Sequence, residues 1–208
     1  MSELENKKIY KSVIIGLDLS TTCTGFAILD AETHALVSYG KLFPVTRGLT
    51  QYNKIEKKLI QMDSIVKQIQ EVIQQYKPIV ILIEEITGSK NRLTQKTLDG
   101  FHWLVLQGLT PHLDLVQFFD VTGAAGWRTK LQLRLSDADK DHNKQAIQIN
   151  KKLAKGTRPI PKIGPKHLAC RYVNKKYGKD FNVDLDESDA DVCDAIAMTS
   201  AFCALHKR

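Results

Sequence analysis

The apolar positions in the first part of the chain predict three short strands. Lys11–Leu19 is a run rich in β-branched residues that ends at an acid, and Gly25–Leu29 and Leu36–Leu42 follow it at hairpin distances, with polar turns between them. Strands that follow one another so closely are typical of an antiparallel meander.

The period of the pattern then changes, and Gln51–Tyr76 is predicted to be a helix. Its apolar residues alternate steps of four and three, which places them on one helix face, opposite a face of Lys, Gln and Glu. This stripe consists of Ile55, Leu59, Met62, Val66, Ile69 and Ile73. Because it is too short for a sustained coiled coil, it favours packing against a sheet.

Helices and strands alternate after this helix. Pro78 ends it, and Ile79–Ile83 is a continuous apolar run that indicates a central strand buried on both faces. A helix is expected over Leu93–Leu109 and a further buried strand over Leu115–Asp120.

Beyond Gly126 the pattern loosens into a basic segment. Residues 155–166, KGTRPIPKIGPK, are rich in Pro and Gly, and we interpret about 137–165 as a loop-like, mobile insertion rather than a second domain. A short basic helix is expected over Lys166–Tyr177, and the last helix from about Glu187 to His206. The order of elements predicts a single α/β domain over residues 1–208, with a mixed five-stranded sheet and helices on both faces.

Composition agrees with one globular domain. The chain has 208 residues, of which 43% are hydrophobic and 25% charged. No apolar run approaches the roughly 20 residues that a membrane span requires, and the polar first residues lack the apolar core of a secretory signal. The four cysteines show neither metal-ligand spacing nor a dense disulfide pattern, so we expect reduced thiols and a cytoplasmic protein.

The formal net charge of +7 is unevenly distributed. Twelve Lys or Arg and three Asp lie between Asp137 and Lys179, a local charge of +9, so the rest of the chain carries −2. A concentrated basic segment on a near-neutral body is typical of proteins that bind polyanions, although a solvated surface loop would show the same pattern.

Four acids lie where predicted elements begin or end. Asp18 ends the first strand, and Glu84 follows the apolar run of the central strand. Asp191 and Asp194 lie three residues apart near the start of the last helix, so both project to the same face. Strand ends and a helix N-terminus converge at the edge of an open α/β sheet, where such sheets bind ligands.

Such a cluster of carboxylates requires a cation, because the four charges repel one another. All-oxygen ligation suits Mg²⁺ or Mn²⁺ rather than zinc. Two such ions about 4 Å apart activate a water and stabilise the leaving oxygen of a phosphodiester. Asp18 alone would be explained as a turn residue, and Asp191 and Asp194 as a helix cap. Their occurrence together with Glu84 favours a catalytic metal site.

Three runs carry a resemblance to a known family. IGLDLSTTCTGFAILD (15–30), ILIEEI (81–86) and DADVCDAIAM (189–198) resemble, in the same order, the RuvC family of Holliday-junction resolvases, particularly its phage-encoded branch. The resemblance implies a ribonuclease H-like fold and a Mg²⁺-dependent endodeoxyribonuclease of the crossover-junction type, acting on four-way junctions, forks or flaps. It also implies the cytoplasm of a bacterium or of a phage-infected host as the location. In the family two magnesium ions, for which Mn²⁺ substitutes, are held by four acids. The matching residues here are Asp18, Glu84, Asp191 and Asp194.

Two acids lie near the motif without matching it. Glu85 points to the opposite face of a strand from Glu84, and Asp189 lies about 140° around a helix from Asp194. The insertion at about 137–165 is absent from bacterial members. The family's base-stacking aromatic after the catalytic Glu is replaced by Thr-Gly-Ser at 87–89, so no base preference is implied.

Basic residues near the acids are the candidate DNA contacts. The resemblance implies that Arg128 and Lys166 touch DNA near the scissile phosphate, and Lys166 would also stabilise charge in the transition state. The full set is Lys90, Arg92, Lys96, Arg128 and Lys166. We interpret Trp127 as a core anchor rather than a base-stacking platform.

The basic segment is expected to lie along the arms of the DNA and to supply affinity more than rate. If five of its cations pair with phosphates, the dependence of log K on log salt should steepen by roughly four to five. The five cations considered are Lys151, Lys152, Lys155, Arg158 and Lys162.

Two symmetric nicks require two active sites, so a homodimer is expected. The predicted helix Leu93–Leu109 is the candidate interface, through Phe101, Trp103, Leu104 and Leu106, which fit an ordinary core equally well.

Two other functions fit parts of the pattern. GLDLSTTCTG also resembles the phosphate-binding hairpin of the actin, heat-shock chaperone and sugar-kinase superfamily, in which Thr21 to Thr24 would hold ATP phosphates and Asp18 would hold Mg²⁺. Those proteins need two such domains, and the sequence shows no second hairpin. A non-catalytic branched-DNA binder would keep the basic segment, but it would gain nothing from four carboxylates that repel phosphate.

Overall fold

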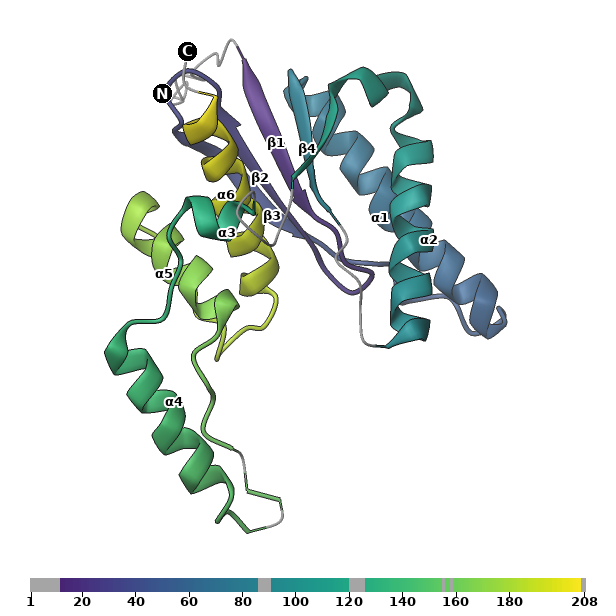
Figure 1. Ribbon diagram of the computed structural model, residues 1–208. Coiled ribbons are helices and arrows are strands. Elements are labelled where there is room, and N and C mark those ends of the chain that lie inside the picture. The colour runs from purple at the N-terminus through teal and green to yellow at the C-terminus, as the bar shows by residue number, and fades with distance from the viewer. Residues whose placement is uncertain (1–11, 86–90, 120–125, 155, 158, 207–208) are drawn as a thin grey trace, which may run out of the picture.

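The fold is built on one mixed sheet of five strands, in the order β3-β2-β1-β4-β5 (Figure 1). The structure is a computed structural model and describes residues 12–85, 91–119, 126–154, 156–157 and 159–206. The predicted meander is confirmed, because β1, β2 and β3 pair antiparallel, whereas β4 and β5 run parallel to β1. The strands are β1 (Val13–Asp18), β2 (Thr24–Asp30), β3 (Leu36–Leu42), β4 (Val80–Glu84) and β5 (Val116–Phe119).

Helices α1 (Lys54–Tyr76) and α2 (Arg92–Gly108) cover one face of the sheet, and a short 3-10 helix, η1 (Thr110–Leu115), leads from α2 into β5. The stripe predicted for α1 packs on the sheet only in its later part, from Met62 onward. Ile55 and Leu59 are 73% and 55% exposed, because the first turns of α1 extend past the sheet (Figure 1).

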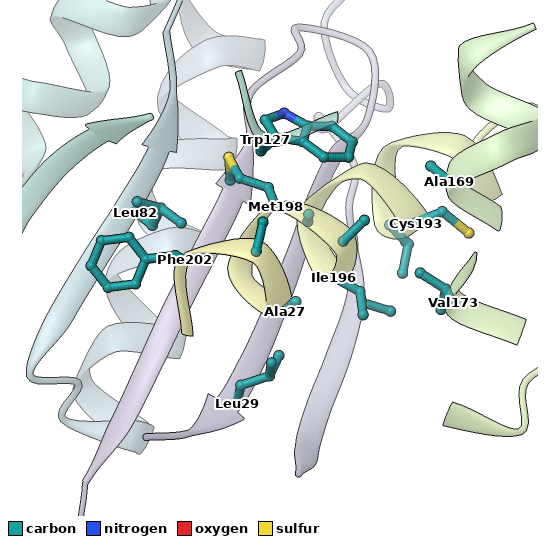
Figure 2. Packing of buried hydrophobic residues seen from close by; sticks show 14 of the residues in the cluster. Ala27, Leu29, Leu82, Trp127, Ala169, Val173, Cys193, Ile196, Met198 and Phe202 are labelled. Atoms are coloured by element: carbon teal, nitrogen blue, oxygen red, sulfur yellow. The ribbon is translucent and has the colours of Figure 1, made fainter. Parts of the chain in front are cut away.

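The other face is covered by α6 (Asp189–Leu205), with α5 (Pro165–Tyr177) and the short α3 (Trp127–Lys130) beside it. Figure 2 shows α6 between the sheet residues Ala27 and Leu29 and the α5 residues Ala169 and Val173. Because neighbours surround it, α6 is apolar on most sides, and its side chains from Val192 to Cys203 are buried. The predicted α/β fold with helices on both faces is confirmed.

A projecting segment joins α3 to α5. It begins with a helix, α4 (Asp137–Asn150), and returns to α5 as extended chain (Figure 1). We call residues 137–163 the arm and residues 160–163 its return segment. Part of the stretch predicted to be loop-like is therefore helical. Ser136 and Asp139 form a capping box at its start, but its few apolar residues gave too weak a period to predict it.

Two further findings bear on the class of protein. No helix in the described part of the chain is long and apolar enough to cross a membrane. All four cysteines are free and buried.

Candidate active site

Asp18 and Glu84 lie side by side because they end two neighbouring parallel strands. The register of β1 and β4 pairs Leu17 with Ile83, so the next residue of each strand is one of the two acids. Both side chains are half-buried at the carboxyl edge of the sheet. The sequence prediction that these strand ends meet is confirmed.

The start of α6 brings Asp191 and Asp194 to the same edge. Asp18 is paired across the sheet with Gly25 of β2, and a Cβ on Gly25 would collide with the backbone of Asp191. Only glycine allows α6 to approach β2 this closely. Gly25 therefore places the first turns of α6 directly beside the end of β1.

The four acids line one pocket with a volume of about 380 Å³. Arg128 of α3 and Lys166 of α5 line it together with them, as do Leu98 and His102 of α2. Predicted side chains from five distant parts of the sequence thus share a single site.

Burial removes the carboxylates of this pocket from water, and nearby cations balance their negative charges only in part. Burial, followed by the charges of Glu84, Asp194 and Asp191, raises the pKa of Asp18 well above its ordinary value. Burial also raises the pKa of Asp191, against the opposing charge of Lys166. For Asp194, burial and the charge of Glu84 raise the pKa although Arg128 lies close by. Such a cluster favours the approach of a cation.

Two basic side chains contact the acids directly. Arg128 Nη2 lies 2.7 Å from Asp194 Oδ2, and its Nη1 lies 3.8 Å from Glu84 Oε1. Lys166 Nζ lies 3.5 Å from Asp191 Oδ1. Arg128 is thus turned toward the carboxylates, whereas Lys166 remains exposed at the rim of the pocket.

The donor set fits a hard divalent cation. Asp194 is 4% exposed, and its Oδ1 has no hydrogen-bond partner among the described residues. A buried carboxylate oxygen without a partner is costly unless a cation or donor reaches it. Within the described residues no three His, Cys, Asp or Glu side chains are arranged to hold a metal ion together as they stand, and Asp191 and Asp194 pair with Lys166 and Arg128 instead.

The two neighbouring acids are separated by the tertiary structure. Asp189 is engaged elsewhere, because it accepts hydrogen bonds from Lys41 Nζ at 2.7 Å and from the backbone N–H of Asn182 at 2.9 Å. Glu85 lines the pocket with Glu84, contrary to the prediction that it points to the opposite face. The physical reason is that β4 ends at Glu84, so strand alternation no longer applies to the next residue.

Two further predicted DNA contacts, Arg92 and Lys96, do not line the pocket. Arg92 and Lys96 are exposed and one turn apart at the start of α2. Lys90 and the Thr-Gly-Ser stretch 87–89 lie outside the described residues, as do Lys155 and Arg158 of the arm and Asp120 at the end of the last predicted strand.

Sequence reasoning missed two residues of the site. Trp127 is fully buried, as predicted for a core anchor, but its indole Nε1 also donates a hydrogen bond of 2.8 Å to Glu84 Oε1. His102 lines the pocket from α2, one turn after Leu98, and burial lowers its pKa to about 4 against the opposing charge of Asp99. No local signal marks either role, since both depend on contacts between distant segments.

Comparison with known proteins supports this architecture. No protein-family model matches the chain, and no curated protein sequence matches it significantly. Among solved structures, Thermus thermophilus RuvC is similar with a TM-score of 0.52 and 17% identity, over 93% of this chain and 95% of that one.

Two structures with bound DNA also match. T. thermophilus RuvC in complex with Holliday junction substrate has a TM-score of 0.49 and 16% identity, over 94% of this chain and 97% of that one. The fowlpox virus resolvase complexed with Holliday junction DNA has a TM-score of 0.41 and 13% identity, over 94% of this chain and 99% of that one. At such identities the likeness concerns the fold. The chain therefore shares the fold of Thermus thermophilus RuvC, which its sequence motifs predicted.

Proposed function

We propose that this protein is a divalent-metal-dependent endonuclease that cuts branched DNA, with the four-way junction as its first candidate substrate. The observation that carries the proposal is the convergence of Asp18, Glu84, Asp191 and Asp194 in one pocket that also holds Lys166 and Arg128. The resemblance of the three sequence motifs and the likeness of the fold point to the same activity.

The four acids are the proposed ligands of Mg²⁺ or Mn²⁺. The unpartnered Oδ1 of Asp194 and the raised pKa of Asp18 support this assignment. When bound, two such ions supply an activated water and stabilise the leaving oxygen of the phosphodiester. The acids themselves fix the place of the reaction, because two strand ends and one helix hold them rigidly.

Lys166 and Arg128 are the proposed groups that receive the scissile phosphate. Lys166 is exposed at the rim, within reach of incoming DNA, and its ammonium would stabilise charge that develops on the phosphate. Arg128 would orient Asp194 and offer its remaining N–H groups to the substrate.

The DNA on the other side of the pocket is expected to meet α2. Arg92 and Lys96 present two cations on one exposed face of its first turns. Lys90 precedes them in sequence and stays a predicted contact. Such contacts with the DNA backbone supply affinity and fix the position of the protein on the DNA without recognising its base sequence.

A homodimer would place two such sites on one junction, as two symmetric nicks require. Of the four interface candidates on α2, Phe101 is a fully buried core residue, whereas Trp103 is 72% exposed. Leu104 and Leu106 pack partly against the core. Trp103 and Leu93, which is 73% exposed, are therefore the proposed centre of the contact.

The ATP-binding alternative finds less support in the turn between β1 and β2. Its hydroxyls contact each other and the local backbone: Ser20 Oγ lies 3.1 Å from Thr22 Oγ1, and Thr24 Oγ1 donates to Ser20 O at 3.0 Å. A phosphate-binding turn would need these groups to face the ligand.

One experiment separates the candidate functions. Labelled four-way junction, flap and plain duplex are incubated with Mg²⁺, beside the Asp191→Asn variant and an ATP hydrolysis assay. Cleavage of branched DNA that Asp191→Asn abolishes supports the proposal. Binding to the junction without any cleavage would instead favour the non-catalytic binder, and ATP hydrolysis without DNA cleavage the ATP-binding domain.

A further inference from the structure

The arm is held in one shape by two asparagines of α4. Asn143 Nδ2 donates to Ile163 O at 2.8 Å, and its Oδ1 accepts from Ile163 N at 2.8 Å. Asn150 makes the same pair of bonds with Ile160, at 2.9 Å and 2.8 Å. Each asparagine side chain thus donates to the C=O and accepts from the N–H of one isoleucine, as the backbone of a paired β-strand would.

The two contacts are about the same distance apart along the helix α4 and along the extended return segment. Asn143 and Asn150 are two helical turns apart, a rise of about 10 Å, and the three residues from Ile160 to Ile163 span about the same length when extended. Between the two asparagines, on the same helix face, Ala146 is 1% exposed. Its small side chain lets the return segment lie close to α4.

The base of the arm is fixed to the domain. Asp139, which is 6% exposed, accepts a hydrogen bond of 2.7 Å from Arg171 Nη1 of α5. The return segment continues without a break through Gly164 and Pro165 to Lys166 at the start of α5. The described residues of the arm therefore form a projection that is attached beside the pocket.

The charges of the arm are separated along its length. All of its acids lie in the first turns of α4, and each is paired: Asp137 with Lys140, Asp141 with Lys144 and Asp139 with Arg171. No acid follows in the sequence until Asp180. Three exposed cations of the outer arm have no ion-pair partner among the described residues, namely Lys151, Lys152 and Lys162.

The arm and the pocket lie at the same end of the molecule. In Figure 1 the arm extends from the end at which α2 and α6 begin, and the start of α6 carries Asp191 and Asp194. Lys166 at the pocket rim, Lys162 on the return segment and Lys151 at the tip follow one another outward. A path of positive charge therefore leads from the pocket along the arm.

We propose that the arm is a preformed docking site for the duplex that leads away from the cleaved phosphate. The inference rests on the proposed function and names the part of the substrate that the arm binds. Asn143 and Asn150 are positioning residues in this proposal, because they fix where the cations of the arm stand relative to the pocket.

The dimensions give the place of contact on the DNA. Eight residues of helix from Asn143 to Lys151 rise about 12 Å, and the three residues from Ile163 to Lys166 add at most about 10 Å. The tip therefore lies roughly 15–20 Å beyond the pocket rim. At about 3.4 Å per base pair, this corresponds to about five or six base pairs from the cleaved phosphate.

A scan with uncharged methylphosphonate linkages tests this position without shortening the duplex. Binding to four-way junctions that carry neutral linkages at defined distances from the cleavage site is measured by fluorescence anisotropy in EDTA. Neutral linkages five and six base pairs away should weaken binding at least fivefold, and linkages about twelve base pairs away less than twofold. Equal binding at all positions from four to eight base pairs would overturn the proposal.

Two variants separate charge from rigidity. Replacing Lys151, Lys152 and Lys162 by Gln should flatten the slope of log K against log salt by about three and abolish the response to the neutral linkages. The matched control replaces the exposed Lys54 and Lys58 of α1 and Lys77 at its C-cap by Gln and should change neither. Asn143→Ala with Asn150→Ala keeps every charge, so it should retain most of the salt slope but lose the positional response.

The outcomes distinguish a failure of the docking proposal from a failure of the proposed function. If neither the neutral linkages nor the replacement of the three lysines changed binding or cleavage, the docking site would be rejected. The proposed nuclease activity would then still stand. A positional response that survives in the double asparagine variant would reject the role of the two asparagines. Absence of any binding or cleavage of branched DNA by the unaltered protein would reject the proposed function and this inference together.

Discussion

The indole Nε1 of Trp127 donates a hydrogen bond of 2.8 Å to Oε1 of Glu84, a residue 43 positions away in sequence. The guanidinium of Arg128 lies 4.2 Å from the centre of the same indole ring and reaches Asp194. Two consecutive residues of the short helix α3 therefore hold one carboxylate from β4 and one from α6. A fully buried tryptophan thus supports both the core and the geometry of the proposed metal ligands.

Trp127→Phe should lower cleavage about ten- to a hundredfold, because a hydrogen bond to a charged acceptor contributes about 1.5–3 kcal/mol. An aromatic side chain remains in the core and the cations that bind DNA are unchanged, so junction binding should change little. Single-turnover rates and the Mg²⁺ concentration for half-maximal activity measure the effect. Tyr52→Phe, which removes a polar hydrogen from an exposed aromatic side chain outside the pocket, is the control. An unchanged rate and Mg²⁺ requirement for Trp127→Phe would contradict the positioning role.

Changing any of Asp18, Glu84, Asp191 or Asp194 to its amide should remove nearly all cleavage and leave junction binding largely intact. Each carboxylate is a proposed metal ligand, whereas binding depends on Lys and Arg. Cleavage and binding are measured on the same four-way junction. Glu85→Gln is the internal comparison within the pocket. A wild-type rate for Glu84→Gln would defeat the assignment.

Mg²⁺ or Mn²⁺ should support turnover, and Ca²⁺ binding only. The larger, looser coordination shell of Ca²⁺ is poorly suited to hold two ions at the separation that in-line attack requires. Cleavage is followed after dialysis against EDTA and re-addition of each ion. Robust activity in EDTA would refute a metal mechanism.

Stability should fall between pH 6.5 and pH 4 because of His102. Burial lowers its pKa from 6.5 to about 4, so in this window the unfolded chain binds a proton that the folded protein does not, and stability decreases as the pH falls. At pH 5 the loss amounts to about 2 kcal/mol. Asp99 on the same helix and the pocket acids Asp18, Glu84 and Glu85 also face this region.

The contribution of His102 is isolated by comparison with His102→Gln. Chemical denaturation at pH 7.5 and pH 5 in EDTA should show a smaller loss of stability for the variant, since the neighbouring carboxylates titrate in both proteins. An equal loss in both would show that His102 is not held neutral by burial.

The protein should be a homodimer that Trp103→Ala weakens. Trp103 and Leu93 expose apolar area on α2 that an interface would cover. Light scattering over a concentration series measures the mass. Leu185→Ala, which removes an 86% exposed apolar side chain outside α2, should have no effect. A monomer both free and bound to junction DNA would contradict the expectation.

Local patterns determined most of the fold in advance. The strands β1, β2, β3 and β4 follow from β-branched apolar runs and the turns between them, and α1 follows from its period. The same patterns placed Asp18 and Glu84 at strand ends and Asp191 and Asp194 on one helix face, because strand length and helical period are local properties of the backbone.

Only the tertiary structure decided which neighbouring groups serve the site. Asp189 forms an ion pair with Lys41, and Glu85 lines the pocket because β4 ends one residue earlier. Trp127, His102 and the paired asparagines of the arm acquire their roles from contacts between segments that no sequence period relates. Helix α4 escaped prediction because its stability depends on a cap and on side-chain bonds to the return segment rather than on an apolar stripe. The sequence by itself thus determined where the carboxylates stand in each element, whereas their partners were decided by packing, since a side chain meets its neighbours only when distant segments have been brought together.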